Sequence, residues 1–270
     1  MELNLEKGIL YLIGGKEDRY YEKKVLTKMI ELTKASDITL IPTASSYPLE
    51  MAREYKDAFL DLGVENINVL DIRYKEDVDT DENKKVIEKT DVVFFTGGDQ
   101  VRLGEIMFGS KLLDLIKSRH NKGVHIAGSS AGAHIASDPV LYYGERWGLI
   151  KGSVESCEGF GFLSDITIDT HFSNRKRIQR LTQFLLSSKS NMGIGLDENT
   201  AIAISNDNTF EVVGSGFVTI LKKTKDYETN YDELSLKEKI SVDGLSLSFL
   251  SNGMKYDLNK FKLLKFKKLA

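Results

Sequence analysis

The chain has 270 residues, of which 41% are hydrophobic and 29% are charged. These proportions are typical of a folded globular protein and exclude a mainly disordered one. The formal net charge of −3 provides no basic field that would attract nucleic acid or an anionic membrane. The single cysteine, Cys157, excludes an internal disulfide and a cysteine-based zinc site, and it suits a reducing compartment. We therefore expect one domain over residues 1–270, in the cytoplasm, without nucleic-acid or membrane partners.

The first two hundred residues alternate short apolar runs with helical patterns, which is typical of a parallel sheet covered by helices. The start of the chain has an acidic residue and only a short apolar run, so we expect neither a signal peptide nor a membrane span there. The predicted strands are Gly8–Ile13, Asp37–Ile41, Ile67–Leu70, Asp91–Phe95 and Val124–Ala127. The runs LIPT and VVFF are continuously apolar, which indicates burial on both faces of the sheet.

Polar or glycine-rich segments directly follow four of these predicted strands. They are GGKEDR at 14–19, TASS at 43–46, TGGDQ at 96–100 and GSSAG at 128–132. Ligands of open parallel sheets bind beyond the carboxyl ends of the strands. We therefore expect the four segments to converge on one crevice.

The pattern changes at about Thr200 to short β-like pieces separated by Asn, Asp and Gly turn signals. These pieces predict an antiparallel, β-rich C-terminal extension of the same domain over about residues 205–270. The lysine-rich end KFKLLKFKK at 260–268 indicates an edge strand whose lysines oppose aggregation. The predicted fold class is therefore α/β, with a mostly parallel sheet flanked by helices and this β-rich extension.

Residues 123–133, GVHIAGSSAGA, join an apolar strand to a helical segment through G-S-S-A-G. This arrangement is typical of a nucleophile elbow, in which a serine sits on a tight strand-to-helix turn. The G-x-S-x-G register selects Ser130 over Ser129 as the nucleophile. The backbone N–H of Ala131 would then be one donor to the oxyanion. The alternative is a small-residue turn in which Ser130 caps the helix.

A serine nucleophile needs a base, and the chain has four histidines. His120 ends a basic helical segment, where we expect it to be solvated. His125 lies within the strand before Ser130, and His134 follows one helical turn beyond it, where it is expected to pack against the sheet. His171 ends the strand-like segment DITIDTHF, from which it can reach the crevice. His171 is therefore the predicted base.

The third member of such a site is a carboxylate that fixes the histidine tautomer and stabilises the imidazolium. GIGLDENTAI at 193–202 offers Asp197 and Glu198 for this role. By strand alternation only one of them faces the crevice, and the residues alone do not choose between them. The chain order of serine, histidine and acid also differs from that of the usual α/β-hydrolases, which disfavours that fold.

From Gly14 to about Ala201, several segments match one family in order and spacing. They are IGG with a nearby acidic residue, IPTASS, FFTGGDQ, GSSAGA, GFGFL, DTHFSNRKRIQRL and GIGLDENTA. Together they resemble the serine peptidase family that contains cyanophycinase and the aspartyl dipeptidases, and the last two segments favour the cyanophycinase branch. The resemblance implies a fold similar to class I glutamine amidotransferases and a homodimer, and it implies neither a metal nor an organic cofactor.

The resemblance also implies roles for individual residues. It makes Ser130 the nucleophile, His171 the base and Glu198 the acid. It pairs the N–H of Gly98 with that of Ala131 in the oxyanion hole. The positions that match the family's substrate cleft are Gln100, Asp169, Arg175, Arg177 and Arg180. Arginines suit substrate carboxylates, and an aspartate suits a cationic group.

Two positions depart from the family pattern. G-S-S-A-G replaces the usual G-T-S-A-G, which keeps a hydroxyl at position 129. Thr170 stands where the cyanophycinase pattern has a glutamine, next to the predicted base. This second change leaves the three catalytic residues in place and bears on the substrate.

The resemblance implies a serine exopeptidase that hydrolyses cyanophycin, multi-L-arginyl-poly-L-aspartate, to β-Asp-Arg dipeptides through an acyl-enzyme. One alternative is an aspartyl dipeptidase or isoaspartyl peptidase that acts on short peptides. Another is a ligand-binding protein that has lost turnover. Nucleotide binding is disfavoured because the chain has no Walker-type segment. A glutaminase is disfavoured because that chemistry normally uses a cysteine at the elbow.

Overall fold

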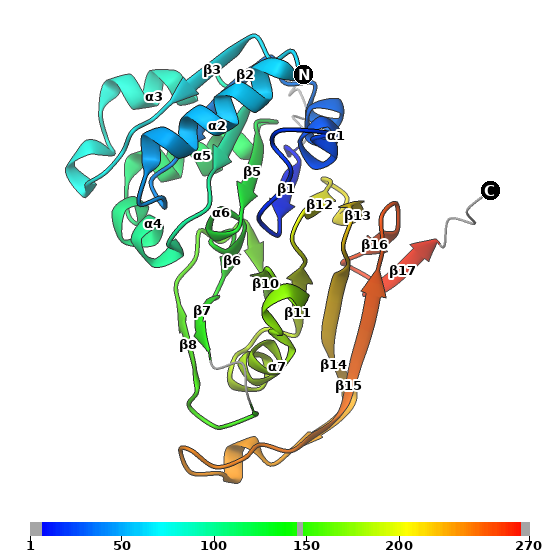
Figure 1. Ribbon diagram of the computed structural model, residues 1–270. Coiled ribbons are helices and arrows are strands. Elements are labelled where there is room, and N and C mark those ends of the chain that lie inside the picture. Colours follow the sequence, from blue (N-terminus) through cyan, green and yellow to red (C-terminus); the bar gives the residue numbers. More distant parts are fainter. Residues whose placement is uncertain (1–6, 145–147, 266–270) are drawn as a thin grey trace, which may run out of the picture.

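The apolar runs of the N-terminal half form the centre of a large sheet (Figure 1). The structure is a computed structural model that describes residues 7–144 and 148–265. Five parallel strands lie in the order β1-β5-β4-β2-β3. They are β1 (Leu10–Ile13), β2 (Asp37–Ile41), β3 (Asn66–Val69), β4 (Val92–Phe95) and β5 (His125–Ser129). Each of them overlaps a strand predicted from the sequence.

Helices cover both faces of this sheet, because successive residues of a strand point to opposite sides. Tyr11 and Ile13 of β1 share a core with α1 and α2, whereas Leu10 and Leu12 share one with α3, α4 and α5. The helices are α1 (Lys24–Thr33), α2 (Pro48–Asp61), α3 (Asp81–Ile87), α4 (Gln100–Met107), α5 (Lys111–His120), α6 (Ala131–His134) and α7 (Ile178–Ser187). Short 3₁₀ turns are η1 (Lys75–Asp77), η2 (Ser173–Arg175) and η3 (Tyr231–Glu233). Across the described ranges, no helix is both long enough and apolar enough to cross a membrane.

The C-terminal strands continue the same sheet on the far side of β1. They are β12 (Thr200–Ile204), β13 (Thr209–Gly214), β16 (Lys255–Asp257) and β17 (Lys262–Lys265), and each pairs antiparallel with its neighbour. The expectation of a mostly parallel sheet therefore holds only for β1–β5, because the C-terminal segment is added to β1 and makes the sheet mixed. β17 is the edge strand that the lysine-rich pattern predicts, and residues 266–270 of that pattern lie outside the described residues.

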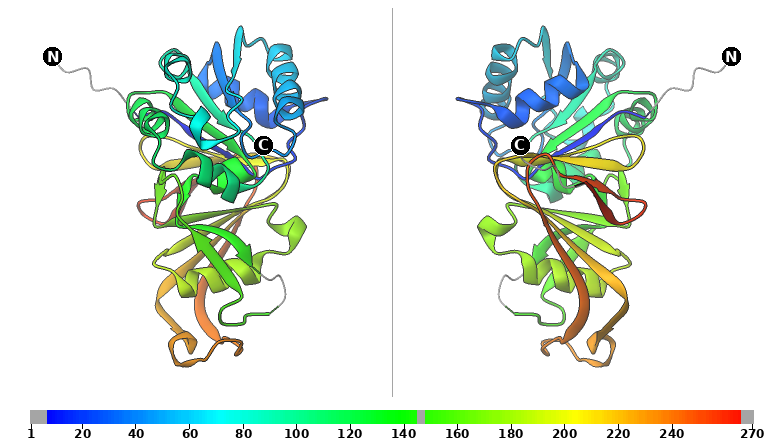
Figure 2. Two further views of the ribbon diagram at one scale, coloured as in Figure 1. Left: turned by 90° about the vertical axis from the view of Figure 1, so that its left-hand side faces the viewer. Right: turned by 90° about the vertical axis from the view of Figure 1, so that its right-hand side faces the viewer.

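A second sheet has the order β10-β11-β14-β15 and lies beside the end of the first (Figures 1 and 2). Its strands are β10 (Ile166–Thr170), β11 (Met192–Leu196), β14 (Val218–Thr229) and β15 (Val242–Leu250). Helix α7 packs on it through Leu181, Phe184 and Leu185. Two small pairings complete the described fold, β6 (Ser137–Asp138) with β9 (Leu163–Ser164) and β7 (Val140–Gly144) with β8 (Val154–Cys157).

The two sheets meet where β1 and β5 end. The N–H of His171, just after β10, donates to the carbonyl of Gly14, just after β1, at 2.9 Å. The N–H of Gly14 in turn donates to the carbonyl of Thr200 in β12 at 2.8 Å. Helix α6 contacts both β5 and β10. This junction collects the ends of strands that are far apart in the sequence, and the predicted site residues lie around it.

Candidate active site

Ser130 lies on a strained turn between β5 and α6. Its backbone has φ 52° and ψ −108°, a conformation that residues other than glycine adopt only when their surroundings hold them there. Its N–H donates to the carbonyl of Ile13 at 3.0 Å. A Cβ on Gly128 would lie 2.3 Å from the carbonyl oxygen of Gly132, so the turn needs a small residue there. This is the local geometry of a nucleophile elbow.

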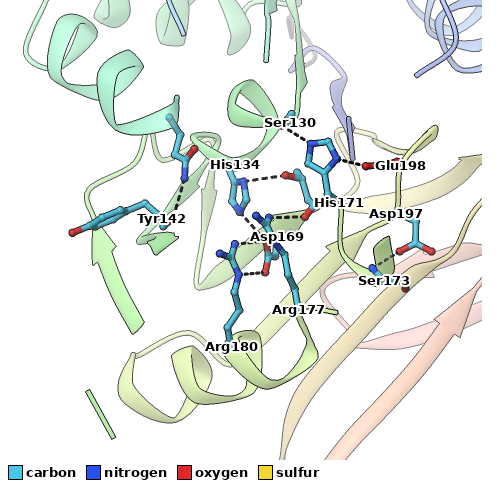
Figure 3. Close-up of polar contacts among 12 residues, drawn as sticks. Ser130, His134, Tyr142, Asp169, His171, Ser173, Arg177, Arg180, Asp197 and Glu198 are labelled. Carbon is cyan, nitrogen blue, oxygen red and sulfur yellow. Dashed lines mark hydrogen bonds and ion pairs between the residues drawn. The ribbon is translucent and has the colours of Figure 1, made fainter. Parts of the chain in front are cut away.

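Three of the predicted residues form a hydrogen-bonded line (Figure 3). Ser130 Oγ lies 2.9 Å from His171 Nε2, and His171 Nδ1 lies 2.8 Å from Glu198 Oε1. The serine comes from the end of β5, the histidine follows β10 and the glutamate follows β11. The histidine also has a positive φ of 49°, which turns it from the strand toward the serine. The structure thus brings together a hydroxyl, an imidazole and a carboxylate in the order that nucleophilic catalysis requires.

Electrostatics favour a neutral imidazole beside an ionised acid. Burial lowers the pKa of His171, the hydrogen bond with Glu198 opposes this, and the charge of Arg175 lowers the pKa further. Burial would raise the pKa of Glu198, but its contacts with His171 and Lys16 lower it. Lys16 Nζ lies 3.1 Å from the same Oε1 that faces the histidine. A neutral His171 can donate from Nδ1 to the acid and accept the serine proton at Nε2.

Asp197, the alternative acid, points away from the histidine. Its carboxylate accepts the N–H of Ser173 at 2.9 Å and the N–H of Phe217 at 3.0 Å. Asp197 therefore fastens η2 to the start of β14, and Glu198 is the residue that reaches His171. The residues alone left open the choice between Asp197 and Glu198. Glu198, the acid that the family resemblance implies, is the one that lies beside His171.

The predicted oxyanion donors belong to α6 and to the loop after β4. Ala131 is the first residue of α6, where backbone N–H groups have no acceptor within the helix. Gly97 lies beside the nucleophile, because a Cβ built on it would be 3.4 Å from Ser130 Cβ. The next residue, Gly98, has φ 145°, and a Cβ there would lie 2.0 Å from the carbonyl oxygen of Ala44. Only glycine fits at this position, and the loop after β4 runs alongside Ser130.

Asp169 and Arg180 do not line a cleft, contrary to the expectation from the sequence. Asp169 is fully buried and Arg180 is 5% exposed. Arg180 donates to Asp169 from Nε at 2.9 Å and from Nη2 at 2.6 Å (Figure 3). Arg177 Nη1 donates to the same carboxylate at 2.9 Å and to the carbonyl of Thr170 at 2.7 Å. The aspartate is satisfied by arginines of its own chain, so it presents no surface to a substrate.

The buried carboxylate of Asp169 stays ionised in this environment. Burial by itself would raise its pKa, but the charge of Arg180 and the contact with His134 outweigh burial and hold the pKa well below its usual range. His134 Nε2 lies 3.1 Å from Asp169 Oδ1, and its Nδ1 lies 3.2 Å from the Thr170 hydroxyl. Burial lowers the pKa of His134 to about 4. The cluster therefore ties β10, the strand that precedes His171, to His134 of α6 and Arg180 of α7.

The other two predicted substrate residues are less buried. Arg175 ends η2 and is half-buried, and its guanidinium has no hydrogen-bond or ion-pair partner among the described residues. Burial is the main cause of the lowered pKa of His171, and the positive charge of Arg175 adds to it. Gln100 begins α4, and its Nε2 donates to the carbonyl of Tyr142 in β7 at 3.2 Å. Of the predicted cations, Arg175 is thus the one placed near the histidine with its guanidinium free.

The remaining histidines and the cysteine have structural surroundings. His120 is buried, not solvated as expected, because the chain turns back over the end of α5 and His120 Nδ1 lies 2.9 Å from the carbonyl oxygen of Val124. His125 Nδ1 accepts the N–H of Ile9 at 2.9 Å. Burial raises the pKa of the Cys157 thiol, and neighbouring acidic groups add to this effect. Cys157 is therefore a poor nucleophile.

Comparison with known proteins shows the family of the chain. The model of "Peptidase family S51" matches residues 10–212. The chain is 32% identical over 256 residues to a cyanophycinase of Nostoc sp. (strain PCC 7120), which covers 93% of this chain and 86% of that protein. It is 30% identical over 261 residues to a cyanophycinase of Geminocystis herdmanii, which covers 95% of this chain and 96% of that protein. Peptidase E of Haemophilus influenzae is 26% identical over 165 residues, which cover 58% of this chain and 70% of that protein.

A solved structure has the same fold. The crystal structure of a peptidase from an acI-B1 Actinobacterium superposes with a TM-score of 0.72, covers 94% of this chain and 98% of that one, and is 23% identical in sequence. The matches to the family model and to the cyanophycinases, which span most of the chain, confirm the family resemblance seen in the sequence segments. The chain belongs to peptidase family S51 and is a serine-type peptidase.

Proposed function

We propose that this peptidase is a cyanophycinase-type serine exopeptidase that hydrolyses cyanophycin to β-Asp-Arg dipeptides. The observation that carries the proposal is the hydrogen-bonded line Ser130–His171–Glu198, with contacts of 2.9 and 2.8 Å. Similarity to cyanophycinases along almost the whole chain supports the choice of substrate. The shorter match to Peptidase E makes an aspartyl dipeptidase the second candidate.

In the proposed reaction, Ser130 Oγ attacks the backbone carbonyl carbon of an aspartyl unit while His171 Nε2 takes the hydroxyl proton. The carbonyl oxygen becomes an oxyanion that the N–H groups of Gly98 and Ala131 stabilise. When the C–N bond breaks, His171 returns the proton to the leaving amine. A water molecule then attacks the acyl-serine with the same base, and Ser130 is released with its proton. Glu198 holds the imidazole orientation through both steps.

Arg175 is the proposed contact for a substrate carboxylate. It is half-buried beside the base, and its guanidinium forms no ion pair within the described chain. A guanidinium binds a carboxylate through two parallel hydrogen bonds. A polymer of aspartate supplies such a group at its chain end. Asp169 and Arg180 support the site from behind in this proposal and do not contact the substrate.

We also propose that residues 1–270 act as one domain in the cytoplasm and as a homodimer. The strands β12, β13, β16 and β17 complete the central sheet, so the C-terminal residues belong to the same folded unit in this proposal. The homodimer stays a prediction from the family resemblance. Light scattering of the purified protein would test it.

Product analysis tests the proposed substrate. The purified protein is incubated with insoluble cyanophycin and, separately, with Asp-Xaa and β-Asp-Xaa dipeptides, and soluble products are identified by mass spectrometry. We expect release of β-Asp-Arg from the polymer. Hydrolysis of the dipeptides without release from the polymer would contradict the cyanophycinase assignment and favour the dipeptidase. Hydrolysis of neither would favour a protein that has lost turnover.

A further inference from the structure

A buried acid lies directly behind the nucleophile elbow. Glu17, in the loop between β1 and α1, is 4% exposed. Its Oε2 accepts the hydroxyl of Ser129, the residue before the nucleophile, at 2.7 Å. Its Oε1 accepts the hydroxyl of Tyr55 from α2. Ser129 and Tyr55 are themselves buried, so both oxygens of Glu17 are engaged inside the protein.

Packing alone gives no reason for an acid at this position. A buried carboxylate costs free energy unless it is paired and hydrogen-bonded, whereas an apolar side chain of similar size would not carry that cost. No ion pair of Glu17 is present among the described residues; Arg19 lies over the Tyr55 ring at 4.9 Å from its centroid and forms its ion pair with Glu54 at 3.1 Å. Burial raises the pKa of Tyr55 well above its ordinary value, so the tyrosine remains a hydroxyl donor to Glu17.

The loop that carries Glu17 also contacts His171 and Glu198, the other two residues of the hydrogen-bonded line. The carbonyl of Gly14 accepts the N–H of His171 at 2.9 Å. Lys16 Nζ lies 3.1 Å from Glu198 Oε1. Gly15 lies against the imidazole, because a Cβ built on it would be 2.5 Å from His171 Cε1. Residues 14–17 therefore lie against the histidine, the acid and the serine: a Cβ on Gly15 would be 3.1 Å from Ser130 Cβ, and Glu17 holds the preceding residue, Ser129.

We propose that Glu17 is a positioning residue that holds Ser129, and through it Ser130, in the geometry that catalysis needs. A residue other than glycine at positive φ stores about 1–3 kcal/mol of strain and stays there only when its neighbours fix it. The hydrogen bond from Ser129 to Glu17 fixes the residue adjacent to the strained one. The hydroxyl at position 129 therefore has a function of its own, as the anchor of the elbow. This inference rests on the proposed role of Ser130 as nucleophile.

Three substitutions test the anchor in the full-length protein. Glu17→Gln has only one acceptor oxygen for two hydroxyl donors, and Ser129→Ala removes one donor while leaving the acid. We expect each to lower kcat, and the second-order rate at which a fluorophosphonate labels Ser130, by at least about tenfold, because small displacements of reacting groups have effects of about that size or larger. KM should change little. Ser129→Thr keeps the hydroxyl and should retain most of the activity.

Controls separate positioning from stability. Glu54→Gln makes the same chemical change at the exposed end of the network and should leave the labelling rate unchanged. A Glu17→Gln protein that unfolds at lower denaturant but is labelled at the wild-type rate while folded would overturn the inference. If Glu17→Gln does not fold, Ser129→Ala decides in the same way.

The outcome also distinguishes this inference from the proposed function. Wild-type protein that is neither labelled nor active would contradict the role of Ser130. The separation of Ser130 Oγ from His171 Nε2 in crystal structures of wild type and Ser129→Ala would then decide the positioning role. An increase in that distance from 2.9 Å is expected, and an unchanged distance would contradict it.

Discussion

Burial and neighbouring charges both shift the pKa of His171. Burial lowers its pKa, Glu198 raises it, and Arg175 lowers it. The base works in its neutral form, so kcat/KM rises with pH through this pKa and is level above it. Removing the Arg175 charge raises the pKa. We therefore expect the acid limb of the pH profile of Arg175→Gln to move to higher pH.

A matched control accompanies this profile. Arg53 on α2 is exposed and is not among the charges that shift the pKa of His171, so Arg53→Gln should leave the acid limb in place. An Arg175→Gln profile with an unshifted acid limb would contradict the electrostatic account of the base. If Arg175 also binds a substrate carboxylate, as proposed, its variant should show a raised KM that Arg53→Gln lacks.

At the level of residues, the sequence predicted the site residues whose positions follow from a local pattern. Ser130 followed from the G-x-S-x-G register and His171 from its place at a strand end. The choice of Glu198 over Asp197 depends on which side chain turns back to the histidine, and the residues alone did not determine it. Glu17 was given no role, although an acidic residue close to the IGG segment that ends the first predicted strand was a signal in the sequence.

At the level of elements, β10 and α7 are joined by buried charges. Asp169 in β10 accepts Arg180 of α7 at 2.9 and 2.6 Å. Asp169→Asn leaves Arg180 buried without its countercharge, which costs roughly 3–5 kcal/mol for a broken buried pair. We expect the free energy of unfolding, measured with urea at pH 7, to fall by about that amount.

The exposed Asp165 before β10 provides the control. Asp165→Asn makes the same chemical change without a buried partner, so its unfolding free energy should stay within about 0.5 kcal/mol of wild type. Equal stability of the two variants would show that the pair between Asp169 and Arg180 does not hold α7 to the second sheet. The family resemblance placed Arg180 in the substrate cleft. Its burial was not predicted, because charged residues are buried only when they are paired and the pairing partner is not visible in a local pattern.

Strand pairing between distant segments was the other element that the sequence did not predict. The apolar runs of β1, β2, β4 and β5 were predicted because these strands are almost wholly buried, and β3 was predicted although it is a partly exposed edge strand. Nothing in the local pattern of residues 200–204 shows that they pair with β1, yet β12 does so antiparallel over four residue pairs, from Leu10 with Ile204 to Ile13 with Ala201. The mixed character of the central sheet follows from this long-range contact.

At the level of the whole molecule, the site exists only where the two sheets meet (Figure 1). The first sheet supplies Ser130 and the loop with Glu17, and the second supplies His171, with Glu198 in the segment after β11 that leads to β12. Four polar segments were expected to converge, and three of them, after β1, β4 and β5, surround Ser130. The segment after β2 contributes Ala44, which packs against Gly98. The second sheet could not be derived from the pattern because its strands are not consecutive in the chain: β12 and β13, which lie between β11 and β14 in the sequence, belong to the first sheet.

The proposed role of Ser130 as the nucleophile is tested most directly by the rate of cyanophycin hydrolysis by Ser130→Ala relative to wild type. We predict that the rate falls by at least about a thousandfold, the size seen when a serine nucleophile is removed from a catalytic triad. The urea unfolding transition should be unchanged within about 1 kcal/mol, because the loss is chemical and not structural. A folded Ser130→Ala protein that still hydrolyses the polymer at a rate near that of wild type would show that Ser130 is not the nucleophile.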